Sequence, residues 1–168
     1  MNARSLVGLV IDTLEFAREG RSVAGFVPVL ALPRVADLVA DGELACTLNG
    51  RRESGRNWLD LTVRGHLELV CQRCLESMPH ELDVTAEIQV IAAGESWPDE
   101  ELEDGTLRLG ADAIAAELEQ SVTDLVEEEV LLALPISPRH EHDCAQPARG
   151  DEKLAASPFA MLATLKKH

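Results

Sequence analysis

The sequence predicts an α+β fold: an antiparallel β-sheet core with a long hairpin, packed by a few helices, and a C-terminal helical tail. Two patterns indicate this fold. Apolar and polar residues alternate over residues 59–71 and 82–90, and an apolar stripe repeats at helical spacing over residues 121–134. Apolar residues make up 46% of the 168 residues and aromatic residues only 3%, so the core is expected to be aliphatic. We expect one α+β domain over residues 1–144, followed by a linker and a helical tail over residues 145–168.

Four short elements are expected before the hairpin. Residues 12–20 have the pattern of a short helix that stops at a glycine. Residues 22–32 are apolar and rich in strand-forming residues, but Pro28 lacks an N–H donor and keeps this segment out of the centre of a sheet. Residues 33–39 suggest a helical turn with proline in its first turn. Alternation over residues 43–48 predicts a strand.

The hairpin is the clearest element of the sequence. Over residues 59–71 the odd-numbered positions are apolar or glycine, and over residues 81–90 the apolar residues take the even-numbered positions. Successive side chains of a strand point to opposite faces of the sheet, so each strand has one core face and one solvent face. Residues 72–80, which include Pro79, are expected to form the loop at the hairpin tip.

The helix over residues 121–134 follows an acidic region. Pro135 and Pro138 are expected to end it. Glu127 to Glu129 are placed mainly on its solvent side, and the acidic, aperiodic residues 93–105 are expected to form a solvated loop. The apolar stripe consists of Val122, Leu125, Val126 and Val130.

The C-terminal residues combine a linker with a short amphipathic segment. Residues 145–156 are expected to be the linker, and Ser157 and Pro158 suit the N-cap and first position of a helix that extends to Lys167. This helix either docks elsewhere through a flexible linker or folds back on the sheet. Its apolar residues fall largely on one side: Phe159, Leu162, Ala163 and Leu165.

The net charge of −15 is concentrated in the middle of the chain. Residues 76–134 contain seventeen acidic side chains and a single basic one, Arg108, whereas residues 1–75 are balanced with nine of each. This acidic region would repel a polyanion such as RNA and attract a basic protein. The alternative is that it is simply a solvated surface.

The sequence also predicts the cellular compartment of the protein. No targeting signal is recognised, and no apolar run approaches the roughly 18 residues of a membrane helix. We therefore expect a cytoplasmic protein with no membrane partner. In a reducing compartment we expect the four cysteines to be thiols or metal ligands in preference to disulfides; they are Cys46, Cys71, Cys74 and Cys144.

A Cys-x-x-Cys motif at the hairpin tip is the most informative local feature. Cys71 and Cys74 have the spacing of a zinc half-site, and the segment His140-Glu141-His142-Asp143-Cys144 contains a second half-site. One or both histidines with Cys144 would complete four ligands and tie the hairpin tip to the segment after the acidic helix. A redox pair fits less well because the motif does not open a helix. The remaining interpretation is a core thiol at Cys71 beside an incidental Cys74, and Leu75 stands where zinc knuckles commonly have glycine.

Basic side chains on the hairpin are candidates for contact with RNA phosphates. The alternative is an ordinary solvated loop, because the group is small and the chain is acidic. The candidates are Arg51, Arg52, Arg56, Arg64 and Arg73.

Catalytic motifs are not found. The sequence contains no glycine-rich phosphate loop, no Gly-x-Ser-x-Gly elbow and no His-Glu-x-x-His pair. His66 is expected on the solvent face of a strand with no nucleophile beside it. We therefore expect neither an enzyme nor a small-molecule substrate.

Three stretches taken in order resemble one family. They are residues 68–74, residues 127–138 leading into His140 to Cys144, and residues 157–166. Their order and spacing resemble the YceD family of bacteria and plastids, the large ribosomal RNA subunit accumulation proteins. The resemblance covers most of the chain from about residue 40 onward.

The resemblance implies a non-enzymatic ribosome biogenesis factor that supports synthesis, processing or stability of 23S rRNA. Its implied partners are the large-subunit ribosomal RNA and/or a basic large-subunit ribosomal protein. Some relatives carry cysteine where this chain has His140, and a His-for-Cys exchange preserves zinc binding. The preferred structural zinc set then becomes Cys71, Cys74, His140 and Cys144, with His142 as the alternative to His140. A second hypothesis is a zinc- or thiol-responsive regulatory binding protein that uses the same cysteines.

Overall fold

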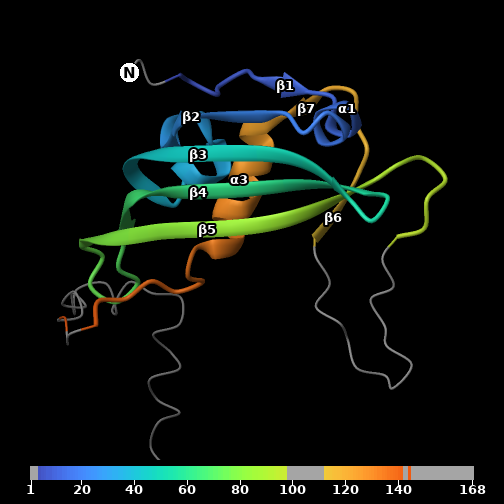
Figure 1. The fold of residues 1–168 in the computed structure, drawn as a ribbon. Coiled ribbons are helices and arrows are strands. Elements are labelled where there is room, and N and C mark those ends of the chain that lie inside the picture. Colours follow the sequence, from blue (N-terminus) through green and yellow to red (C-terminus); the bar gives the residue numbers. More distant parts are fainter. Residues whose placement is uncertain (1–3, 98–111, 142–143, 145–168) are drawn as a thin grey trace, which may run out of the picture.

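Three strands of 15 residues each dominate a computed structural model of the protein (Figure 1). They form the centre of a five-stranded sheet with the order β2-β3-β4-β5-β6. The structure describes residues 4–97, 112–141 and 144. The strands of the sheet are β2 (Ser22–Pro28), β3 (Val39–Glu53), β4 (Arg56–Val70), β5 (Ser77–Ile91) and β6 (Asp112–Ala115).

Two hairpins connect the three long strands. The β3–β4 turn is made by Ser54 and Gly55, whose φ values of 51° and 81° fit the two-residue turns that match the twist of antiparallel strands. The β4–β5 pair extends from Asn57 opposite Val90 to Val70 opposite Ser77. The hairpin predicted from the alternation over residues 59–71 and 82–90 is therefore confirmed, and it is longer than the pattern indicated.

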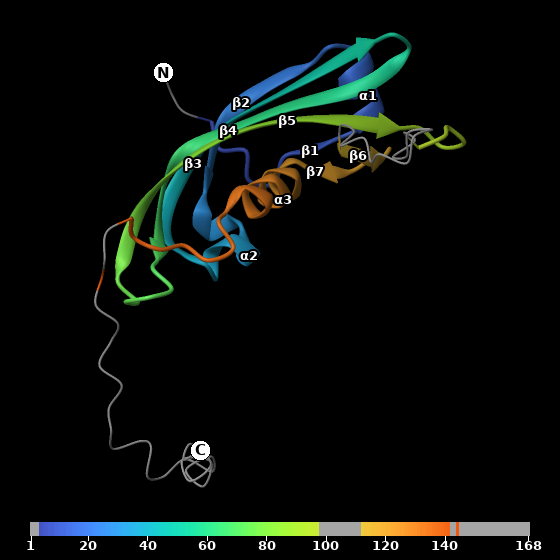
Figure 2. The ribbon, with the colours of Figure 1, turned by 90° about the horizontal axis from the view of Figure 1, so that it is seen from below.

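One face of the sheet is covered by helices and the other is not (Figures 1 and 2). The covered face is the concave one, and it holds α3 (Val122–Ala133), the short α2 (Pro33–Ala36) and a single 3-10 turn at Val29–Ala31. Odd-numbered residues of β4 point into this core, as predicted. The largest fully buried side chains are aliphatic, and they include Leu6, Leu32, Leu44, Leu48, Leu59, Leu61, Leu67 and Ile88.

The predicted N-terminal helix is α1 (Thr13–Arg18). Asp12 caps it, because its side chain accepts a hydrogen bond of 2.9 Å from the backbone N–H of Glu15. Beside α1, the two-residue strands β1 (Val10–Ile11) and β7 (Gln120–Ser121) pair antiparallel and form a small second sheet. The sequence did not predict these strands, because two residues are too few to show a period.

The edge strands correct one prediction and confirm another. β6 pairs parallel to β5 over Ile88 to Ile91, so the sheet is mixed and not purely antiparallel. Four residues in an acidic surrounding carry too little alternation to predict a strand or its direction. β2 lies at the opposite edge of the sheet and ends at Pro28, as the missing N–H of proline requires.

Pro79 lies in a strand, and its predicted place in the hairpin loop is wrong. It is part of β5 and pairs with Glu68 of β4. A proline is tolerated here because β6 pairs with β5 only over residues 88–91, so in the described part of the chain no strand uses the outer side of β5 at residue 79.

Glu127 and Glu129 were predicted on the solvent side of the acidic helix, and both are buried in α3. Glu127 Oε1 accepts the backbone N–H of Arg34, and Oε2 accepts Arg34 Nε, both at 2.7 Å. Burial opposes its charge, but the hydrogen bonds and charge of Arg34 lower the pKa of Glu127 overall. For Glu129, burial, followed by the nearby carboxylates of Asp112 and Glu128, raises the pKa.

Several sequence-based predictions lie outside the described residues. They are the second half of the acidic loop, the linker over residues 145–156 and the C-terminal helix, and the domain boundary at residue 144 stays a prediction. Among the helices that the structure describes, none is long and apolar enough to cross a membrane.

Candidate metal centre

The β4–β5 turn brings Cys71 and Cys74 together. Cys71 directly follows β4, where its N–H donates to the carbonyl of Glu76 and its own carbonyl accepts from the N–H of Leu75, both at 2.9 Å. The chain thus reverses within four residues, and the N–H of Arg73 points at Cys71 Sγ at 3.4 Å. A thiolate at Cys71 is the natural acceptor of such a bond.

Leu75 adopts the backbone conformation that usually belongs to glycine. Its φ is +65°, in the left-handed region, although its side chain is largely exposed. The sequence lacks the glycine typical of a zinc knuckle at this position, and here leucine takes the left-handed conformation instead. Left-handed backbone costs a non-glycine residue roughly 1–2 kcal/mol, so the surrounding contacts must offset this strain.

A second segment, after α3, completes the group. Leu134 leaves the helix with extended backbone before Pro135, as expected for a residue before proline. The carbonyl of Pro138 then accepts the N–H of Gln72 at 2.8 Å, which fixes this segment against the β4–β5 turn.

Four ligand atoms converge at this point. Cys71 Sγ lies 3.7 Å from Cys144 Sγ, and Cys74 Sγ lies 3.4 Å from His140 Nδ1. All four ligand atoms lie within 4.8 Å of one another. The sequence-preferred set of Cys71, Cys74, His140 and Cys144 is therefore brought together, whereas His142 lies outside the described residues.

The spacing fits a tetrahedral zinc ion. With Zn–S bonds of about 2.3 Å and Zn–N bonds of about 2.0–2.1 Å, tetrahedral angles place neighbouring sulfurs about 3.8 Å apart and a sulfur and a nitrogen about 3.5 Å apart. The observed distances of 3.7 Å and 3.4 Å agree with these values. Three sulfurs and one nitrogen form a closed set of the structural kind, with no position left for a substrate.

The electrostatics of the thiols also favour a cation. Desolvation raises the pKa of Cys71, but backbone N–H groups of Cys74, Arg73 and His140 outweigh it and lower this pKa to about 5. For Cys74, the N–H of Glu76 lowers the pKa, whereas desolvation and the neighbouring thiols of Cys71 and Cys144 raise it. The net result is a raised pKa for Cys74. Several thiolates this close repel one another unless a positive charge lies between them.

Cys46 does not belong to the group. It lies in the core of β3, where its thiol is 3.6 Å from the carbonyl of Leu44, and burial raises the pKa of Cys46 to about 12. A buried neutral thiol of this kind behaves as a small apolar side chain.

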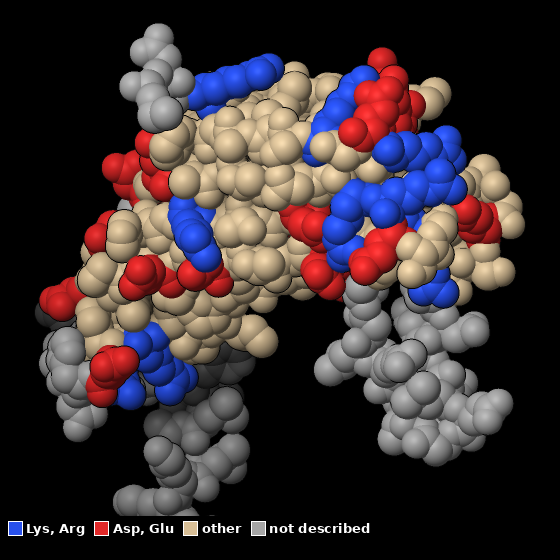
Figure 3. All heavy atoms as spheres, in the orientation of Figure 1, with Lys and Arg blue, Asp and Glu red and all other residues tan. Residues whose placement is uncertain are grey.

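The five candidate arginines fall at different places along the hairpin. Arg51, Arg52 and Arg56 lie at the β3–β4 end, Arg64 lies in the middle of β4, and Arg73 lies beside the cysteines at the opposite end. Basic and acidic side chains are interleaved at the β3–β4 end (Figure 3).

Ion pairs hold two of these arginines. Arg51 contacts Glu53, Asp60 at 2.8 Å and Glu87 at 3.3 Å, and its guanidinium lies 5.0 Å from the Trp58 ring centroid. Arg64 pairs with Asp83 at 2.9 Å. Within the described residues no such ion pair involves Arg52 or Arg56, and Arg73 is engaged in the turn.

A family comparison covers the cysteine cluster and most of the β4–β5 hairpin. The model for the large ribosomal RNA subunit accumulation protein YceD matches residues 59–166, which is more than half of the chain. The chain belongs to the YceD family. Comparisons with curated proteins and with solved structures found no match.

The YceD match separates two groups of candidate residues. All four ligand residues, Arg64 and Arg73 fall inside the matched range, whereas Arg51, Arg52 and Arg56 precede it. The resemblance to the YceD family expected from three separate stretches is thereby confirmed, and the family description associates the chain with accumulation of the large-subunit ribosomal RNA.

Proposed function

We propose that this protein is a cytoplasmic ribosome biogenesis factor that supports synthesis, processing or stability of 23S rRNA by binding and not by catalysis. The observation that carries the proposal is the YceD family match over residues 59–166, which includes β4 from Leu59 onward, β5, α3 and the cysteine cluster. The closed Cys₃His ligand set also favours a structural centre over a catalytic one.

The metal centre is proposed to hold one structural zinc ion. The ion would join the β4–β5 turn to the segment after α3, two parts of the chain that are about 65 residues apart in sequence. Its role would be to stabilise a rigid end of the molecule.

A basic large-subunit ribosomal protein is the proposed principal partner. Residues 76–134 carry seventeen acidic side chains against one basic, and a basic surface would be attracted to them. Because Arg51 and Arg64 already form ion pairs with carboxylates, they are less available to contact RNA phosphates. Contact with ribosomal RNA is proposed as secondary, through Arg52 and Arg56 at the β3–β4 end of the hairpin.

Sedimentation in sucrose gradients tests the function. The protein is expected to co-migrate with precursors of the large subunit, and its depletion is expected to lower 23S rRNA relative to 16S rRNA. The proposal is wrong if the protein stays at the top of the gradient and its loss leaves 23S rRNA unchanged.

Elemental analysis and thermal unfolding test the zinc centre. The purified protein is expected to contain one equivalent of zinc, and Cys71→Ser or Cys144→Ser is expected to lose most of it and unfold at a lower temperature. Cys46→Ala serves as the matched control, because it removes a buried thiol outside the cluster and should retain zinc. Less than about a tenth of an equivalent in the wild type, with Cys71→Ser as stable as wild type, would contradict the zinc proposal.

Thiol chemistry supports a second candidate, a zinc- or thiol-responsive regulatory binding protein. The lowered pKa of Cys71 and its 3.7 Å approach to Cys144 are features of an oxidisable pair. Mild oxidant would then release zinc and change partner binding. Binding that is unaffected after complete oxidation of both thiols would exclude this candidate.

A further inference from the structure

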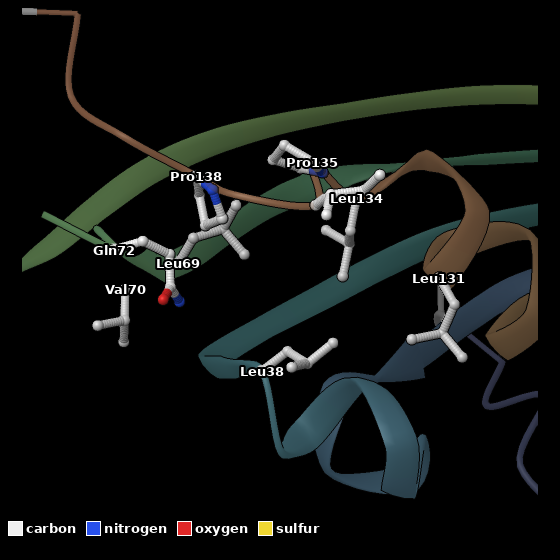
Figure 4. A pocket seen from close by; sticks show the side chains of 9 residues that line it. Leu38, Leu69, Val70, Gln72, Leu131, Leu134, Pro135 and Pro138 are labelled. Carbon is white, nitrogen blue, oxygen red and sulfur yellow. The ribbon is translucent and has the colours of Figure 1, made fainter. Parts of the chain in front are cut away.

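An apolar groove lies beside the metal centre, and neither the family description nor the proposed function uses it. It encloses about 200 Å³. Figure 4 shows side chains from three parts of the chain around it: the end of β4, the end of α3 with the segment that follows, and the turn after α2. Its lining consists of Leu38, Leu69, Val70, Gln72, Leu131, Leu134, Pro135, Ile136 and Pro138.

The groove is open to solvent at apolar side chains. Ile136 is fully exposed, Leu38 is 54% exposed and Val70 is 38% exposed. Exposed apolar residues are ordinary when single, but a contiguous group around a concavity marks a binding surface. The hydrogen bond from Gln72 to the Pro138 carbonyl fixes one wall against another, so the concavity is formed before anything binds.

The described part of the chain ends near this groove. Its last described residue is Cys144, whose Sγ lies 3.7 Å from that of Cys71. Cys71 in turn stands in sequence between Val70 and Gln72, both of which line the groove. The twelve residues 145–156 separate Cys144 from Ser157, and an extended chain of that length spans at most about 40 Å. Residues 157–167 are therefore within reach of the groove.

The sequence of residues 157–167 matches the groove in chemistry. Phe159, Leu162 and Ala163 recur at the spacing of one helical face. A helix of about ten residues is marginal in water and needs a surface that buries its apolar face. An apolar cavity of roughly 150 Å³ holds a benzene ring, so the groove can accept the ring of Phe159.

We propose that residues 157–167 of this same chain dock along the groove, with the Phe159 ring inserted between the end of β4 and the end of α3. Tethering favours this occupant, because a short linker gives the segment an effective concentration on the order of millimolar at the groove. The inference requires neither zinc occupancy nor a ribosomal partner, so its test is separate from theirs.

Photo-crosslinking in the full chain tests the occupant. With p-benzoylphenylalanine at position 159, illumination is expected to join this position to residues 131–138 or to Leu38 within one molecule, at a yield independent of protein concentration. Crosslinks found only between two copies would overturn the proposal, and so would the absence of any crosslink to the groove.

Amide hydrogen exchange with a matched pair of variants gives the second measurement. In the full chain, residues 157–167 are expected to exchange at least tenfold more slowly than an unstructured peptide of the same sequence. Leu38→Glu should abolish most of that protection, whereas Leu30→Glu, which alters an exposed leucine outside the groove, should leave it intact. Exchange of residues 157–167 at the unstructured rate in the wild type would refute the docking. An equal loss of protection in both variants would refute it as well.

Discussion

Leu75 illustrates how a single residue can carry strain at the metal centre. Its left-handed backbone turns the chain back after Cys74, where the carbonyl of Glu76 accepts the N–H of Cys71. This conformation costs leucine more free energy than it would cost glycine. The side chain is 63% exposed, so little burial compensates for the strain.

Leu75→Gly is expected to stabilise the protein by about 1 kcal/mol, because relief of the strain outweighs the added freedom of glycine in the unfolded chain. Thermal unfolding of the zinc-loaded protein measures the change. Glu76→Gly is the control, since Glu76 is not among the residues with positive φ, and it should lower stability. A decrease of similar size in both variants would contradict the strain at Leu75.

Glu127 is the second residue whose role depends on its surroundings. Its carboxylate accepts two hydrogen bonds from Arg34, one of them from the backbone near the start of α2, and thereby connects α3 to α2. The pKa of Glu127 is lower in the folded protein than in the unfolded chain. Its contribution to stability is therefore complete above the unfolded pKa of about 4.3 and is lost as pH falls through the lower folded pKa.

Glu127→Gln is expected to lower the melting temperature by a few degrees at pH 7. The difference from wild type should shrink as the pH falls below about 4, because the wild-type carboxylate is then protonated as well. Glu128→Gln is the control, since Glu128 is exposed and 3.9 Å from Arg34, and it should have a small effect. A difference between Glu127→Gln and wild type that does not change with pH would argue against the ion pair.

At the scale of elements, close backbone contact positions α1 on the sheet. A Cβ atom at Gly50 of β3 would lie 2.2 Å from the carbonyl oxygen of Phe16 and 2.8 Å from the Cα of Ala17. Backbone atoms cannot move aside as a flexible side chain would, so only glycine fits where the helix crosses this strand.

Gly50→Ala is therefore expected to lower the free energy of unfolding by about 1–3 kcal/mol through overpacking. Urea denaturation measures this change. Gly55→Ala is the comparison, because no atom lies within 4 Å of its added Cβ and only the strain of its positive φ remains. The contact between α1 and β3 would be less tight than described if Gly50→Ala cost no more than Gly55→Ala.

Across the whole molecule, charge is distributed unevenly along the sequence. Residues 1–75 are balanced, whereas residues 76–134 are strongly acidic. Buried Glu127 and Glu129 remove two carboxylates from the surface, but exposed ones remain along β5 and before α3. A surface of one sign mainly accelerates encounter with an oppositely charged partner and makes binding sensitive to salt.

Neutralising exposed carboxylates is expected to weaken ribosomal association more than neutralising arginines. The variant Glu81→Gln with Glu117→Gln and Glu119→Gln should reduce co-sedimentation several-fold and flatten its salt dependence. Arg52→Gln with Arg56→Gln should have the smaller effect. The reverse order, with the arginine variant lost from the large-subunit fractions, would make RNA the principal contact.

The sequence alone predicted the long hairpin, α1 and α3. These predictions succeeded because alternation along β4 and β5 and the apolar stripe of α3 are local patterns. The two half-sites and the YceD resemblance also pointed to the four residues that the structure brings together, and metal binding by them stays a prediction. The YceD resemblance also depended on local stretches whose order could be read directly.

Only the tertiary structure decided what depends on contacts between distant segments. The parallel direction of β6, the burial of Glu127 and the place of Pro79 in β5, opposite Glu68 and away from β6, follow from neighbours that are far away in sequence. The same is true of the convergence of His140 and Cys144 on the β4–β5 turn, and of the groove beside it. A periodic pattern reports which face of an element is apolar, but it does not report which element covers that face.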